Sequence, residues 1–343
     1  MKSVQTVAAN TLELAETPIP NPGKGEVVVK MLAVGICASD TQVFHGKHKY
    51  ATFPVVQGHE GIGIVHAVGQ GVAGFKKGDK VNIQQQLACG VCYACKKGRH
   101  NVCIKLKGIG ILADGLFTEY FLSPEWNVVP LPDTFGVDEG MLIEPTSVAV
   151  NSARVGGVKP GERVVVIGAG IIGNLTAQVC RALGAADILL TDIADAKLAI
   201  AKKDGIPHCV NTMQVPLAQA IEDAFGAGNR PDVIFDCAGV PASINSALAA
   251  AANASRVVIV ANFKEPVTFD IPTFQRREVA ILSVMGTVKE STIEAIQLLA
   301  AGKIQLEGLI SRRFPLDRMM EAYSYIDNNV ATVMKVAIDI TEA

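Results

Sequence analysis

The chain has 343 residues, 49% of them hydrophobic and 19% charged, and its formal net charge is −2. This length allows roughly two domains with separate cores, and the slightly acidic balance argues against a nucleic acid or an anionic membrane as a partner. No apolar run reaches the ~18 residues that a membrane span needs. The start at Met1–Val4 leads directly into strand-like sequence without the apolar core of a signal peptide, so we expect a cytoplasmic protein.

Residues 1–150 carry short strand-like runs that turn signals interrupt often. Glu26–Met31 is such a run, and Pro20–Gly23 and Lys77–Asp79 are typical of turns. This texture predicts a small, mostly antiparallel β-domain.

Cysteines cluster in this region, in the pattern Cys89-x2-Cys92-x2-Cys95-x7-Cys103. In a reducing compartment such clustering favours a metal site over disulfides. Four thiolates form a closed tetrahedral Zn²⁺ site, which is structural because no coordination position stays open. The alternatives are buried free cysteines or an iron–sulfur centre, but the lysines and glycines between these cysteines are not typical of a core face.

Cys37, His59 and Glu60 form a second candidate set. Taken alone, Cys37 is a core cysteine and His59 a loop histidine. Glycines beside both, and the Glu60 carboxylate beside the histidine, favour catalysis instead. A catalytic Zn²⁺ takes three protein ligands and leaves one position open, and a carboxylate is an acceptable third ligand.

Strands and helices alternate from residue 161 to 287. The strands are expected at 163–167, 187–191, 209–210, 233–236, 256–260 and 281–284. Six strands joined by crossover helices predict a doubly wound parallel sheet, with the substrate cleft outside the carboxyl ends of the strands.

The first of these strands runs into a glycine-rich turn, Gly168-Ala169-Gly170-Ile171-Ile172-Gly173, and a helix follows. The second strand delivers Asp192, the acid expected to bind an adenosine ribose. Alone, such a turn is only a glycine turn of an α/β protein, but strand, turn, helix, strand and acid in this order predict dinucleotide binding. The residues expected at the pyrophosphate are Gly168, Gly170, Ile171, Ile172 and Gly173.

The tail, residues 288–343, contains two amphipathic helices near 291–301 and 317–327 and a last strand near 334–339. It has no place in the six-strand sheet. We therefore expect residues 288–343 to complete the domain of residues 1–150, and residues 151–287 to form the dinucleotide-binding domain.

These motifs resemble the zinc-dependent medium-chain dehydrogenase/reductase family, which includes the alcohol and polyol dehydrogenases. Gly58-His59-Glu60 followed by Gly63, Gly69 and Val72 is similar to the zinc signature of that family. The cysteine spacing is similar to its structural-zinc lobe, and Asp114–Tyr120 resembles its DGxFAEY strand. The resemblance implies an α/β protein: a GroES-like β-domain with a catalytic and a structural zinc site, plus a Rossmann domain.

Glu144-Pro145 is typical of the polyol branch, which includes sorbitol and threonine dehydrogenases. The resemblance therefore implies that Cys37, His59 and Glu144 bind the catalytic zinc, with Glu60 as a neighbouring or transient ligand. Whether Glu60 or Glu144 is the direct third ligand stays open. The alternative for Glu144 is a carboxylate that stabilises a helix start.

The chain also departs from the family pattern. Ser39 stands where relatives keep a hydroxyl that hydrogen-bonds the substrate oxygen, but Gln42 replaces the histidine that usually follows in the proton relay. His45 is the nearest titratable group in sequence, and ordered water is the alternative. Met285–Thr287 stands where sorbitol dehydrogenases have a substrate-binding arginine, which argues against sorbitol.

The resemblance implies an enzyme with two Zn²⁺ per chain that moves a hydride reversibly between NAD⁺ and a secondary alcohol of a polyol, sugar or cyclitol. NAD is expected over NADP because no arginine follows Asp192 to receive a 2′-phosphate. Threonine or a sugar phosphate or aldonate is the alternative substrate, and the basic stretch Phe44–Tyr50 is either part of the pocket or a surface loop. A homo-oligomer, a dimer or a tetramer, is expected.

Three other classes are less well supported. A zinc-free quinone reductase lacks these ligand sets, and a crystallin-like structural protein has no need of them. A nucleic-acid-binding zinc ribbon conflicts with the acidic balance of the chain.

Overall fold

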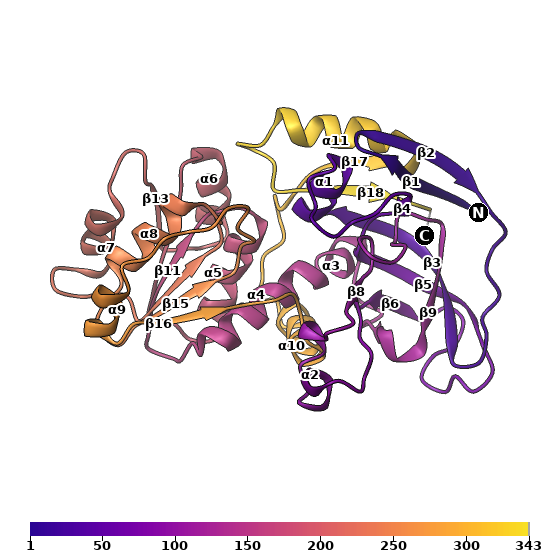
Figure 1. Ribbon diagram of the computed structural model, residues 1–343, viewed down its shortest axis with the longest axis horizontal. Helices are drawn as coiled ribbons and strands as arrows, with labels where there is room; N and C mark the ends of the chain where they lie inside the picture. Colours follow the sequence, from indigo (N-terminus) through magenta and orange to yellow (C-terminus); the bar gives the residue numbers. More distant parts are fainter. Residues whose placement is uncertain (342–343) are drawn as a thin grey trace.

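The computed structural model describes residues 1–341. Figure 1 shows two halves side by side, one built on antiparallel strands and the other on a parallel sheet. We call them the antiparallel half and the parallel half. The first residues and the last described residues both lie in the antiparallel half. Within the described residues, no helix is long and apolar enough to cross a membrane.

The main sheet of the antiparallel half has the strand order β10-β6-β5-β3-β18-β17, and β9 also pairs with β3. Its strands are β3 (Glu26–Ile36), β5 (Glu60–Val68), β6 (Lys80–Ile83), β9 (Tyr120–Pro124), β10 (Val128–Pro130), β17 (Ile310–Pro315) and β18 (Lys335–Asp339). A smaller sheet contains β1 (Lys2–Ala8), β2 (Thr11–Glu16) and β4 (Val55–Val56), and β7 (Gln86–Leu87) pairs with β8 (Lys107–Gly108). Nearly every residue of β3 is buried, so this strand is the centre of the half.

The chain returns to this sheet at its end. β18 pairs antiparallel with β3, and β17 lies parallel to β18 at the edge. The sequence did not predict β17, because Phe314 is its one buried hydrophobic residue and the strand shows no buried alternation. The short helix η3 (Leu316–Arg318) follows β17 in the chain. Helix α11 (Met319–Asn328) comes next and packs on β17 and β18.

The parallel half confirms the predicted doubly wound sheet, with the order β13-β12-β11-β14-β15-β16 and parallel pairing throughout. The strands are β11 (Arg163–Ile167), β12 (Asp187–Asp192), β13 (His208–Asn211), β14 (Val233–Asp236), β15 (Arg256–Ile259) and β16 (Ala280–Ser283). The helices are α5 (Ile171–Ala182), α6 (Asp195–Lys203), α7 (Leu217–Phe225), α8 (Pro241–Ala250) and α9 (Ile271–Arg277). The strand order reverses beside β11, and such a reversal opens a ligand crevice at the carboxyl ends of the strands.

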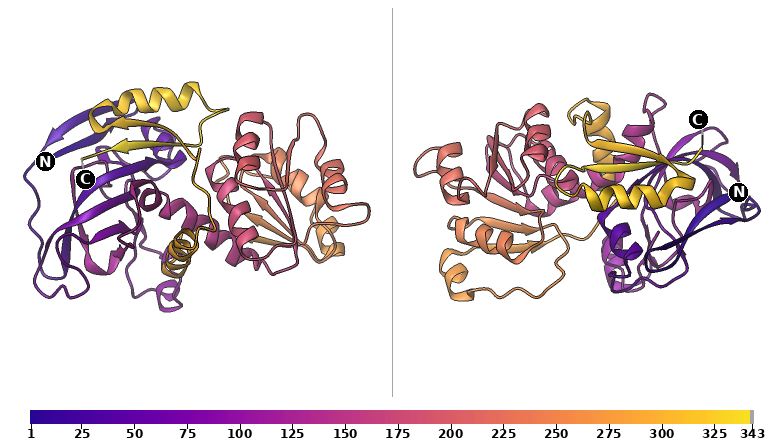
Figure 2. Two further views of the ribbon diagram at one scale, coloured as in Figure 1. Left: turned by 180° about the vertical axis from the view of Figure 1, so that it is seen from behind. Right: turned by 90° about the horizontal axis from the view of Figure 1, so that it is seen from above.

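Two helices, α4 (Ile143–Gly156) and α10 (Lys289–Ala300), pack on each other between the halves (Figure 2). The short α3 (Val137–Met141) precedes α4. One hydrophobic cluster runs through this junction, from Ile62 in β5 through Val150 in α4 to Phe235 in β14. The two halves therefore share a core.

Candidate functional site

The pairing of β3 with β5 brings the first candidate set together. Gly35, near the end of β3, lies opposite Glu60 at the start of β5. Cys37 follows β3 in an extended conformation, and helix α1 (Ala38–Phe44) begins directly after it. Because the two strands are antiparallel, the last residues of β3 and the first residues of β5 lie next to each other.

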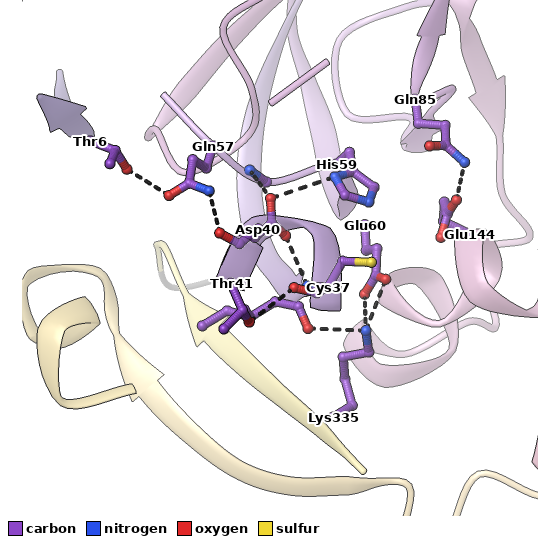
Figure 3. Close-up of polar contacts among 12 residues, drawn as sticks. Thr6, Cys37, Asp40, Thr41, Gln57, His59, Glu60, Gln85, Glu144 and Lys335 are labelled. Atoms are coloured by element: carbon purple, nitrogen blue, oxygen red, sulfur yellow. Dashed lines mark hydrogen bonds and ion pairs between the residues drawn. The ribbon is translucent and has the colours of Figure 1, made fainter. Parts of the chain in front are cut away.

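Donor atoms of Cys37, His59 and Glu60 all lie within 4.8 Å of one another. His59 and Glu60 are buried, and Nδ1 of His59 has no hydrogen-bond partner among the described residues. Figure 3 shows the Cys37 sulfur near both. A thiolate, an imidazole and a carboxylate are zinc ligands, so this cluster fits the metal.

Asp40 lies behind the histidine. It is fully buried, accepts hydrogen bonds from the backbone N–H of Cys37 (2.8 Å) and Gly58 (3.1 Å), and its Oδ1 lies 3.7 Å from Nδ1 of His59. Burial alone would lower the pKa of His59, but Asp40 raises it well above the usual value. A carboxylate behind a metal-binding histidine orients its ring. No sequence motif marks Asp40 for this task, although it follows Ser39 directly in the chain.

Lys335 reaches the same place from β18. Its ammonium lies 2.6 Å from Oε2 of Glu60 and donates a hydrogen bond to the carbonyl of Ile36 (3.1 Å). Burial would lower the pKa of Lys335, but Glu60 raises it, and the net shift is upward. Nothing in the local sequence marks Lys335, because only the register of β18 on β3 brings it to Glu60.

Glu144 lies in the first turn of α4, outside the group of three. It is buried and accepts a hydrogen bond from Nε2 of Gln85 (Figure 3). Burial, together with the charge of Glu60, raises the pKa of Glu144 to about 7. The structure therefore groups Cys37 and His59 with Glu60 and gives Glu144 a neutral amide partner.

Ser39 lies half-buried in the first turn of α1. His45 has other partners: one ring nitrogen lies 2.7 Å from Oδ1 of Asn10 and the other 3.1 Å from Oδ1 of Asp327 in α11. The backbone N–H of His48 donates to the carbonyl of Gln42 at 3.1 Å, and its ring Nδ1 accepts the backbone N–H of Tyr50 at 3.3 Å. Burial lowers the pKa of His48, against the opposing charge of Asp40. In the sequence, His48 is distinguished only as one residue of the basic stretch Phe44–Tyr50.

The four sulfurs of Cys89, Cys92, Cys95 and Cys103 also lie within 4.8 Å of one another. Sγ of Cys92 is 3.5 Å from that of Cys95 and 3.9 Å from that of Cys103. A Zn–S bond of about 2.3 Å in a tetrahedron separates sulfurs by roughly 3.8 Å, so the spacing fits zinc. Backbone N–H groups of Cys95 and Ile104 lower the pKa of Cys92 to about 6, which favours the thiolate. Short helices α2 (Tyr93–Lys96) and η1 (His100–Val102) connect these cysteines.

The glycine turn fits a dinucleotide. A Cβ on Gly173 would overlap the carbonyl oxygen of Gly168, so helix α5 packs against the turn as only glycine allows. A Cβ on Gly170 would meet no atom of residues 1–341 within 4 Å, which leaves room for a phosphate at the start of α5. Oδ2 of Asp192 accepts the N–H of Ala169 at 2.6 Å, which ties the acid to the turn. Ile171 and Ile172 open α5 beside this space.

Comparisons with known proteins agree with this geometry. Residues 23–133 match the alcohol dehydrogenase GroES-like domain, and residues 172–301 match the zinc-binding dehydrogenase domain. The starvation-sensing protein RspB of Escherichia coli K12 is 32% identical over 343 residues, all of both chains. Sorbitol dehydrogenase 1 of Saccharomyces cerevisiae is 33% identical, over 95% of this chain and 94% of its own.

A solved structure, the NADH complex of the rspB alcohol dehydrogenase from Escherichia coli CFT073, superposes with a TM-score of 0.92 at 31% identity, and the match covers 99% of each chain. The chain therefore belongs to the zinc-dependent medium-chain dehydrogenase family and is an NAD-dependent zinc dehydrogenase.

Proposed function

We propose that this dehydrogenase oxidises a secondary alcohol of a polyol, sugar or cyclitol, reversibly. The observation that carries the proposal is the cluster of half-buried Cys37 with buried His59 and Glu60, and with Glu144 on the neighbouring helix α4. Zinc held there would supply a Lewis acid for the substrate hydroxyl, and NAD⁺ would supply the hydride acceptor.

Each residue then has a distinct task. Cys37 and His59 hold the metal together with a carboxylate, Glu60 or Glu144. Asp40 orients His59, and Lys335 neutralises Glu60 at 2.6 Å. Oγ of Ser39 accepts the proton of the substrate hydroxyl while it donates its own onward.

Two further sets of residues bind the cofactor and the second metal. The pyrophosphate would be held by Gly168, Gly170, Ile171, Ile172 and Gly173, and the ribose by Asp192. Cys89, Cys92, Cys95 and Cys103 bind a second, structural zinc.

Neutral amides near Glu144 favour an uncharged, hydroxyl-rich substrate. Gln85 bonds Glu144, and the Gln86 amide lies against Gly286 in the segment that follows β16. Amides both donate and accept hydrogen bonds, as hydroxyl groups do. The second candidate is a sugar phosphate or an aldonate, which the exposed Lys47 and Lys49 favour. Threonine is a third.

The test is NADH formation by the zinc-loaded protein with polyols, inositols, aldonates, sugar phosphates and threonine. We expect the highest kcat/KM for a neutral polyol or cyclitol, and an unchanged KM for it in Lys47→Ala and Lys49→Ala. Gln214→Ala replaces an exposed residue of the parallel half and is the control, which should leave KM unchanged. A tenfold preference for a phosphorylated or acidic substrate would make the second candidate correct.

We also propose that the protein forms a homo-oligomer. β16 ends the six-stranded sheet and is partly exposed, and an open edge of this kind is a template for another strand. Sedimentation analysis of the zinc-loaded protein tests this, and a monomer at micromolar concentration would contradict it. The cytoplasmic location stays a prediction.

A further inference from the structure

One hydrogen bond joins the four-cysteine lobe, residues 89–103, to the parallel half. Asn101 lies in η1, is fully buried, and donates from Nδ2 to the carbonyl of Met285 at 2.7 Å. Met285 belongs to the segment Met285–Thr287, which leaves the carboxyl end of β16. In Figure 1 the lobe with α2 lies below α10, the helix into which this segment leads.

A second amide holds the same segment from α4. Asn151 is 4% exposed, and its Nδ2 donates to the carbonyl of Gly286 at 2.8 Å. It lies about two turns after Glu144 and therefore on the same face of the helix. Gly286 has a φ of +49°, and a Cβ there would overlap the amide of Gln86, so the antiparallel half approaches this backbone closely.

The residue type at position 101 is explained by this contact. Oδ1 of Asn101 has no hydrogen-bond partner within residues 1–341, so the lobe itself does not use the amide as an acceptor. An apolar side chain would fill the same space without burying an unpaired oxygen. Compared with an apolar side chain, asparagine adds an N–H group that donates to the carbonyl of Met285.

We propose that Asn101 is a positioning residue. Its hydrogen bond connects the four-cysteine lobe to Met285–Thr287, and together with the bond from Asn151 it fixes that segment at the cleft between the halves. The inference rests on the proposed function for the location of the cleft. Through the bond from Asn101 to Met285, the lobe influences how substrate and nicotinamide are aligned, although its closed metal site takes no part in the reaction. An alignment error of about 1 Å is enough to slow a reaction markedly.

The test uses the full zinc-loaded chain with Asn101→Ala and Asn151→Ala. The matched control is Asn229→Ala, which removes a similar amide-to-carbonyl bond (to Phe225, 2.6 Å) within the parallel half. Hydrogen exchange followed by mass spectrometry reports on the peptide spanning 284–290, beside zinc content, the Kd for NADH, and kcat and KM for the best alcohol.

We expect exchange of that peptide to rise about tenfold in both variants, the effect of losing one such bond, while the control leaves it unchanged. kcat/KM for the alcohol should fall about tenfold, with the Kd for NADH within twofold and both metals retained. A merely structural role would lower the melting temperature without this selective exchange. The double variant should be less than additive, because both bonds hold one segment.

Unchanged exchange of residues 284–290 in zinc-loaded Asn101→Ala overturns the proposal, and so does an effect in Asn151→Ala alone. Asn101→Ala could lose the metal of the four-cysteine lobe. In that case Asn101→Asp is used in its place, because it keeps the shape of the side chain without the NH₂ donor, and the same exchange results decide the proposal. The exchange measurement needs no substrate. Failure of every alcohol in the panel would therefore count against the proposed function and leave this inference to be decided separately.

Discussion

Lys335 and Glu60 are 275 positions apart in the chain and form a buried ion pair of 2.6 Å beside Cys37. Each is 3% exposed or less. The pair joins the last strand, β18, to the strand that begins at the metal-binding cluster. The C-terminal return of the chain thus contributes a charge to the site as well as two strands to the sheet.

Replacement of Lys335 by methionine should destabilise the metal-free protein by about 3 kcal/mol, because it leaves the Glu60 carboxylate buried and unpaired. The loss should be smaller in zinc-loaded protein, where a cation faces the same carboxylate. Urea unfolding with and without zinc measures both. The double variant Lys335→Met/Glu60→Gln should recover most of the stability, and a loss below 1 kcal/mol in the metal-free single variant would contradict this account.

Metal analysis of the fully loaded chain should give two zinc ions. Cys92→Ser should reduce the content to one and damage folding, because binding at a structural site contributes folding free energy. Cys37→Ser should also leave one zinc, but with the fold intact and no turnover. Cys209→Ser, a half-buried cysteine in the parallel half, is the control and should keep both ions. One zinc in a fully active chain would show that one of the two sites is misassigned.

These two sites show what the sequence could predict. Four cysteines in fifteen residues lie together because the chain between them is short, so local spacing predicts the lobe. The parallel sheet was predictable for a similar reason, since each strand is a buried apolar run. Lys335, β17 and the bond from Asn101 to Met285 depend on strand register and on the packing of the two halves, which no local pattern records.

Asp192→Ala should weaken NADH binding about tenfold and reduce the preference over NADPH. The carboxylate repels a 2′-phosphate, and it also ties down the turn through Ala169 at 2.6 Å. Fluorescence titration gives both dissociation constants. Asp195→Ala, which loses only a bond to Asn211, is the nearby control. Equal affinity of the unmodified chain for NADH and NADPH would refute the assignment.

Ser39→Ala should lower kcat on the order of 10²-fold at neutral pH, because one proton-transfer group contributes about that much. The control is Ser324→Ala, on the exposed side of α11. Full activity of Ser39→Ala would remove the relay.

The proton relay from Ser39 has two candidate histidine ends, His45 and His48. Sequence proximity pointed to His45, yet both of its ring nitrogens lie against Asn10 and Asp327. His48 is half-buried, and its backbone N–H donates to the carbonyl of Gln42. It lies close enough to Asp40 for that carboxylate to raise its pKa against the effect of burial.

A histidine accepts a proton only when neutral, so alcohol oxidation should slow as the pH falls through the pKa of His48. Burial sets that pKa below the usual 6.5, and the slowing should therefore begin only in mildly acidic solution. In His48→Asn this acidic limb of the kcat profile should disappear, and kcat should already be low at neutral pH, whereas His45→Asn should keep the profile of the unmodified enzyme. If His45→Asn alone alters the limb, the original assignment to His45 is correct. If neither variant alters it, the proton leaves through ordered water, because no side chain of this loop then limits its transfer.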